Sequence, residues 1–106
     1  MFTDRIQADY DELEAIARQF DREGQDVERL LMRIRALVEE LEGGGWQGQG
    51  ARAFYDEMYQ EVLPALRRLF DALYQASDAT TQIIHTLRQA ETEAGRIFEF
   101  GQGRRP

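Results

Sequence analysis

The sequence lacks cysteine and long hydrophobic runs. Without cysteine, the chain can form neither a disulfide framework nor a thiolate metal site. No segment approaches the roughly 18 consecutive apolar residues of a membrane-spanning helix, so we expect no membrane insertion. The N-terminus, MFTDRIQADYDELE, is acidic where a cleaved signal peptide would be basic and then apolar. If the protein leaves the cell, we therefore expect a route that uses no cleaved signal peptide.

Positive charge is also scarce, and histidine occurs once. The chain carries 13 Lys and Arg against 20 Asp and Glu, a formal net charge of -7, which argues against a nucleic-acid partner or an anionic membrane. A di-iron site in a helical bundle needs Glu-x-x-His pairs, but Gln82 stands three residues before His85. A catalytic triad cannot be assembled from one histidine on an outward row. We therefore predict no enzyme activity, no metal and no cofactor.

Helical periodicity fills almost the whole chain, and no alternating strand pattern occurs. Alternate steps of four and three from Ile6 meet only apolar residues or glycine as far as Leu41. This pattern predicts a first helix at about residues 3–42, on the order of 60 Å long. The same stepping from Tyr55 to Ile97 predicts a second helix at about residues 51–97. We expect an all-α fold in which residues 1–106 form a single helical-hairpin domain, with a turn at 43–50 and a flexible tail at 98–106.

The apolar face of the second helix is wider than one neighbouring helix can cover. Its flanks carry further apolar residues, including Phe70 and Ile84, which we expect to meet a partner. An antiparallel two-helix hairpin buries only one seam, so we predict that two hairpins dimerise into a four-helix bundle. The residues predicted to form the hairpin and dimer seams are Leu13, Phe20, Val27, Leu31, Ile34, Tyr55, Met58, Tyr59, Val62, Leu66, Leu69, Phe70, Leu73, Ile83, Ile84 and Leu87.

Pro64 interrupts the second helical pattern. A proline inside a helix removes a hydrogen bond and costs about 3 kcal/mol. By its heptad position Pro64 lies opposite the seam, where water can reach the freed carbonyl near Gln60, so we predict a kink near Pro64 rather than a break. His85 falls on the same outward row, and we interpret it as a solvated surface residue.

The stretch GGGWQGQG at residues 43–50 twice spells a dinucleotide-binding fingerprint, as GxGxxG and as GxGxxA. That fingerprint works when a strand leads into the glycines, whereas the preceding LLMRIRALVEELE is helical by its period. We therefore interpret the glycines as a reversal between two helices. Trp46 either folds back over Leu41 and Phe54 or is held at the tip as a recognition anchor, and the two roles are compatible.

The combination of 106 residues, two long helices and a central Trp46-Gln47-Gly48 turn followed by Gly-Ala-Arg-Ala-Phe resembles the WXG-100 family. These are small helical hairpins exported by type VII (ESX-type) secretion systems, and the resemblance covers nearly the whole chain. It implies a dimeric four-helix bundle, formed with itself or with a paralogous hairpin. It further implies synthesis in the bacterial cytoplasm, delivery to a type VII secretion ATPase and secretion without a cleaved signal peptide, with Trp46 and Gly48 as half of a bipartite export signal.

The other half of the family's signal is Tyr-x-x-x-Asp/Glu just after the second helix, and the tail GRIFEFGQGRRP contains no tyrosine. Tyr74 with Asp78 fits the letters, as does Tyr10 with Glu14, but both pairs lie inside predicted helices. Three explanations stay open: a divergent tail signal, a heterodimer whose partner carries the motif, or a relative that is no longer exported. Two functions follow, a secreted WXG-like effector or adaptor, and an intracellular chaperone-like or structural hairpin that pairs with a larger toxin.

Overall fold

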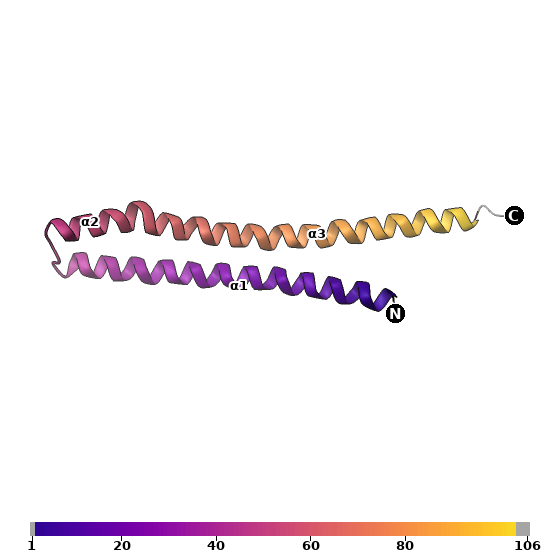
Figure 1. Cartoon of the computed structure of the whole chain (residues 1–106), viewed down its shortest axis with the longest axis horizontal. Coiled ribbons are helices and arrows are strands. Elements are labelled where there is room, and N and C mark those ends of the chain that lie inside the picture. The colour runs from indigo at the N-terminus through magenta and orange to yellow at the C-terminus, as the bar shows by residue number, and fades with distance from the viewer. Residues whose placement is uncertain (1, 104–106) are drawn as a thin grey trace.

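The computed structural model describes the backbone of residues 2–103 and the side chains of residues 4–98, which form one long helical hairpin (Figure 1). Helix α1 spans Phe2–Gly43. After a short turn, α2 (Gln49–Glu57), the π-helical turn η1 (Met58–Val62) and α3 (Leu63–Gly103) follow one another without a break. Together these three form a rod that packs antiparallel to α1. The described residues contain no strand, which confirms the predicted all-α hairpin.

The residues of α1 that face α3 recur at every seventh position, and this spacing keeps one stripe of the helix against its neighbour. Two of them are small and let α3 approach closely. The Ser77 hydroxyl donates a hydrogen bond to the Ala17 carbonyl at 2.8 Å. A Cβ added to Gly24 would lie 2.8 Å from Cε1 of Tyr74. The complete buried row is Tyr10, Ala17, Gly24, Leu31 and Val38.

The seam of α3 differs from the predicted one. Leu63 and Ile84 are 3% and 6% exposed against α1, and Phe70 is half-buried. Leu69 and Ile83, which the 4–3 stepping placed in the seam, are 47% and 51% exposed. Ile84, expected to meet a partner, is therefore covered within the hairpin, and Phe70 of the same row is half-buried. The extra residue in η1 accounts for the exchange of this row for its neighbour, while Leu66 and Leu73 of the predicted seam stay half-buried.

The chain stays helical through Pro64, and the irregularity lies just before it. The N–H of Leu63 donates to the carbonyl of Met58, five residues back, as in a π-turn. In an α-helical turn the proline ring would press on the carbonyl four residues back, that of Gln60. The wider turn, visible as a bulge between α2 and α3 in Figure 1, relieves this contact. Pro64 is half-buried beside Leu63 rather than fully outward as predicted.

Helix α3 extends to Gly103, beyond the end predicted near residue 97. Glycine costs a helix only about 1 kcal/mol and keeps its N–H donor, so the glycine at position 95 does not stop it. The predicted flexible tail is therefore wrong for residues 98–103, and residues 104–106 lie outside the described range. Ile97 and Phe98, near this end of the helix, are 73% and 66% exposed.

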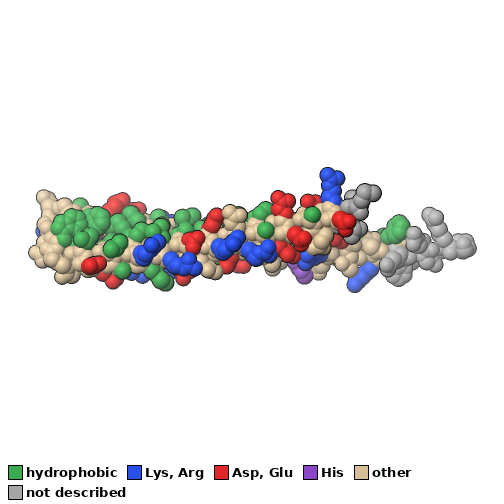
Figure 2. All heavy atoms as spheres, turned by 90° about the horizontal axis from the view of Figure 1, so that it is seen from below, with side chains coloured by type: hydrophobic (Ala, Val, Ile, Leu, Met, Phe, Trp, Pro, Cys, Tyr) green, Lys and Arg blue, Asp and Glu red, His purple; other side chains and the backbone are tan. Residues whose placement is uncertain are grey.

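The hairpin has one polar side and one apolar side. On the polar side Arg88 pairs with Glu14 at 3.2 Å, and Tyr74 donates to Glu28 at 2.8 Å. The flanks of α1 and α3 that lie opposite these contacts are together on the other side of the hairpin, because the two helices are antiparallel. We call this side the apolar face. In Figure 2 hydrophobic side chains gather over the half of the molecule nearest the turn. The apolar face carries Leu13, Phe20, Val27, Leu30, Ile34, Leu37 and Leu41 of α1, with Val62, Leu66, Leu69, Leu73, Ile83 and Leu87 of the second rod.

Candidate functional site

Backbone hydrogen bonds fix the turn that follows α1. The N–H of Gly45 donates to the carbonyl of Glu42, and the N–H of Trp46 donates to the carbonyl of Leu41, each at 3.2 Å. With φ of 85° at Gly45, this pair of bonds makes a Schellman motif. The left-handed conformation suits glycine because it has no Cβ. The motif sets the position of Trp46 directly beyond the end of α1.

Gly48 sets the start of the next helix. Its backbone has φ 117° and ψ 179°, a region that is essentially limited to glycine. Its carbonyl accepts the N–H of Arg52 at 3.0 Å, which begins α2. A Cβ at this position would meet nothing within 4 Å. Backbone conformation, and not lack of space, therefore explains glycine at position 48.

The Trp46 ring packs against two aromatic side chains of α2. Its centroid lies 5.3 Å from that of Phe54 and 5.5 Å from that of Tyr55, both in edge-to-face arrangements. The Tyr55 hydroxyl also donates to the Trp46 carbonyl at 2.9 Å. Trp46 nevertheless stays 44% exposed. The indole thus covers the end of the hairpin and still presents a surface to solvent.

Tyr59 joins the two helices at the base of the turn. Its hydroxyl donates to Oε1 of Glu42 at 2.5 Å. This hydrogen bond, with desolvation and the negative charges of Glu42 and Glu39, raises the pKa of Tyr59 to about 12. The sequence pattern placed Tyr59 in a seam but gave Glu42 no role. Only the placement of both helices shows that this carboxylate faces the phenol.

An open pocket of about 430 Å³ lies beside the turn. The two predicted signal residues, Trp46 and Gly48, both contribute to its wall. The pocket combines aromatic surface with one carboxylate and one guanidinium, a mixture suited to contact with another protein. It is lined by Glu42, Trp46, Gln47, Gly48, Ala51, Arg52 and Tyr55.

Tyr74 and Asp78, the predicted second half of the signal, lie in the middle of α3 rather than after it. Tyr74 is half-buried over Gly24, and its hydrogen bond to Glu28 raises its pKa. Asp78 is exposed. The tyrosine therefore takes part in packing the hairpin, with Asp78 about one turn further along the same helix.

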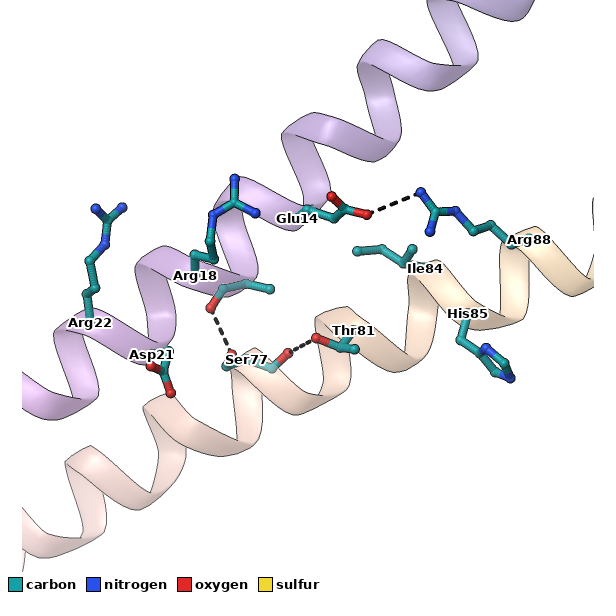
Figure 3. A pocket seen from close by; sticks show the side chains of 10 residues that line it. Glu14, Arg18, Asp21, Arg22, Ser77, Thr81, Ile84, His85 and Arg88 are labelled. Atoms are coloured by element: carbon teal, nitrogen blue, oxygen red, sulfur yellow. Dashed lines mark hydrogen bonds and ion pairs between the residues drawn. The ribbon is translucent and has the colours of Figure 1, made fainter.

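A larger groove of about 710 Å³ runs along the polar side of the hairpin (Figure 3). The Glu14–Arg88 ion pair lies at one end of it, and the small side chains of Ala17 and Ser77 border it further along. His85 is exposed, and its ring points away from α1. Among the side chains of residues 4–98, no three His, Cys, Asp or Glu are grouped closely enough to hold a metal ion.

The fold and the turn define a class of protein, the small antiparallel helical hairpin whose two helices are joined by Trp-x-Gly. A family model described as WXG100, "Proteins of 100 residues with WXG", matches residues 5–92. The chain therefore belongs to the WXG100 family. It is also similar to Protein YukE of Bacillus subtilis (strain 168), with 26% identity over 83 residues that cover 78% of this chain and 84% of YukE. No solved structure is significantly similar to the chain.

Membership of this family confirms the resemblance seen in the sequence and implies a small helical protein of type VII secretion. WXG100 proteins are non-enzymatic secretion substrates that form homodimers or pair with similar hairpins. The family also suggests secretion without a signal peptide. In the part of the chain that the structure describes, none of the helices has the length and apolar character needed to cross a membrane.

Proposed function

We propose that the protein is a type VII secretion substrate that acts outside the cell as an effector or adaptor, and that Trp46 and Gly48 form a turn read by the secretion ATPase. The exposed indole carries this proposal. A Schellman motif, a glycine-only conformation and two aromatic contacts hold Trp46 in one position, yet 44% of it stays exposed. A side chain that is fixed without being buried is suited to recognition by another protein.

A second copy of the chain is the proposed occupant of the apolar face. Six large hydrophobic side chains that are exposed in the described part of the chain lie together on this face, namely Leu30, Leu37, Leu41, Leu69, Ile83 and Leu87. Exposure of this extent on one side of a rod marks a protein interface. A twofold arrangement would set the apolar face of each hairpin against the other and complete a four-helix bundle. A paralogous hairpin in place of the second copy would appear as a heterodimer.

Secretion can be tested by measuring the protein in culture supernatant and cell lysate of the native host, with and without its type VII ATPase. We expect the protein in the supernatant of the parent strain and its retention in the ATPase-deleted strain. A cytoplasmic enzyme measured in both supernatants controls for lysis. Equal amounts of the protein in the two supernatants, with no lysis, would remove the export proposal.

One observation favours a second function, that of an intracellular chaperone-like hairpin bound to a larger toxin. The letters of the Tyr-x-x-x-Asp motif at Tyr74 and Asp78 lie within α3 and not after it. Co-purification from the native host separates the two functions. A larger partner that stays bound through high-salt washes, with both proteins retained in the cell, supports the chaperone. Recovery of the hairpin alone or with a hairpin of similar size supports the secreted dimer.

A further inference from the structure

Helix α3 carries two neighbouring apolar rows, and only one of them can face α1. The row that faces α1 is Leu63, Phe70, Ser77 and Ile84. The row one residue earlier lies toward the apolar face and is Val62, Leu69, Ala76 and Ile83. This second row contains no polar residue, whereas the first contains a serine. Hydrophobicity alone therefore does not explain which row is buried in the hairpin.

The π-turn η1 determines which of the two rows faces α1. A residue of an α-helix advances about 100° around the axis, and a π-turn accommodates one residue more than an α-turn. If residues 58–62 were α-helical and α2 kept its place, each residue of α3 would move to the position that its successor now holds. Leu69 would then replace Phe70 against α1, and Ile83 would replace Ile84.

The same shift would change the surface of the rod. The positions now held by Val62, Leu69, Ala76 and Ile83 would pass to their predecessors in the sequence. Those predecessors are all polar or charged, namely Glu61, Arg68, Gln75 and Gln82. The contribution of α3 to the apolar face thus depends on the extra residue in η1.

Pro64 supplies a physical reason for that extra residue. A proline ring clashes with the carbonyl four residues earlier in an α-helix and cannot donate a hydrogen bond to it. Here that carbonyl belongs to Gln60, which lies inside η1. The N–H of Leu63 donates to the carbonyl of Met58, five residues back instead of four. The π-turn ends at Val62, two residues before the proline that would strain an α-turn.

We propose that Pro64 is a register-determining residue. By enforcing η1 it rotates α3 so that Phe70 and Ile84 pack within the hairpin while Leu69 and Ile83 are presented to a second copy of the chain. The rotation of α3 is a property of the hairpin alone. The presentation of Leu69 and Ile83 to a second copy rests on the dimer proposed above. Polar contacts such as that of Tyr74 with Glu28 also favour the observed register, so the effect of the proline must be separated from theirs.

Nuclear Overhauser contacts of Gly24 report the register directly, because Gly24 lies against the Tyr74 ring. The wild-type protein should show a contact between Gly24 Hα and the Tyr74 ring. In Pro64→Ala we expect this contact to be lost and a contact to Leu73 to appear. Retention of the Tyr74 contact in Pro64→Ala would overturn the proposal, since the register would then be held without the proline.

A second variant combines Pro64→Ala with deletion of Glu61 and remains informative if Pro64→Ala folds poorly. Without the proline and the extra residue, a continuous α-helix should restore the wild-type register and the Gly24 contact to Tyr74. If η1 forms independently of the proline, the deletion would instead bring Gln75 against Gly24. That result would also overturn the proposal.

Sedimentation velocity on the same samples tests the second part of the proposal, namely that the observed register presents Leu69 and Ile83 to a second copy of the chain. We expect a wild-type dimer, a dimer dissociation constant raised about tenfold or more in Pro64→Ala, and recovery in the double variant. A register change without weaker dimerisation would overturn the link between Pro64 and the second copy. A monomeric wild-type protein would remove the proposed dimer and leave the rotation to be judged by the Gly24 contacts.

Discussion

Replacing Gly48 by alanine isolates the backbone requirement of the Trp-x-Gly turn. Gly48 has φ 117° and ψ 179°, and a Cβ at this position would meet nothing within 4 Å. The substitution therefore adds no clash and changes only the conformational energy of the turn. A residue with a side chain held in such a sparsely populated region costs on the order of 1–3 kcal/mol. We expect Gly48→Ala to lower the free energy of unfolding by about that amount.

Gly50→Ala is the matched control, two residues further along the chain. A Cβ at Gly50 also meets nothing within 4 Å, but Gly50 lies in α2 and its φ is not positive. Replacing a glycine where alanine fits the backbone restricts the unfolded chain and stabilises a protein by about 0.4–1 kcal/mol. The same chemical change should thus have opposite signs at the two positions.

Thermal unfolding followed by circular dichroism measures both changes. For a domain of this size, 1 kcal/mol shifts the melting temperature by roughly 4–8 °C. All variants must be compared at one protein concentration, because dimerisation makes the melting temperature depend on concentration. Equal melting temperatures for Gly48→Ala and Gly50→Ala would refute the argument that φ at position 48 demands glycine.

Three further predictions concern the helices. The pKa of Tyr59, raised to about 12, means that its bond to Glu42 stabilises the fold fully below about pH 10 and is lost as the pH rises through 12. The latest part of the phenol absorbance titration should move toward pH 10 in Glu42→Gln; an unchanged titration would contradict the bond. Gly24→Val should lower the free energy of unfolding by about 1–3 kcal/mol through overpacking against Tyr74, and less when Tyr74→Ala is also present; strictly additive effects in urea unfolding would exclude the contact. Leu69→Asp should weaken the dimer in sedimentation velocity while circular dichroism stays unchanged, and an unaltered dimer would show that the apolar face is not the interface.

The seam of α1 could be predicted from the sequence, because one unbroken heptad pattern crosses the whole helix. Its stepping includes Tyr10, Ala17, Gly24, Leu31 and Val38, which the structure buries. Such regular spacing leaves one orientation that buries the apolar stripe. The hairpin fold followed from this pattern and from the glycine-rich reversal.

The seam of α3 could not be predicted, because the sequence offers two adjacent apolar rows. The 4–3 stepping favoured the row with Leu69 and Ile83, and the structure buries the row with Phe70 and Ile84. Which row faces α1 depends on the one extra residue of η1, just before Pro64. A steric contact between the proline ring and the helix backbone accounts for that extra residue. A proline within a pattern signals an irregularity but does not say whether it is a kink or a π-turn.

For the turn, the sequence predicted the reversal but not the conformation of each glycine. Glycines around Trp46 predicted a reversal, but the sequence does not distinguish Gly45 and Gly48, which have positive φ, from Gly50, which lies in a helix. The bond between Tyr59 and Glu42 depends on the register of two helices and has no local sequence signal.

Secretion of Trp46→Ala tests the central claim most directly, namely that the turn is read by the export machinery. The variant should be expressed in the native host and measured in supernatant and lysate, with its helicity checked by circular dichroism on the purified protein. The account predicts nearly unchanged helicity, because α1 and α3 pack along their length without Trp46, together with loss of the variant from the supernatant. Normal secretion of a folded Trp46→Ala protein would contradict it.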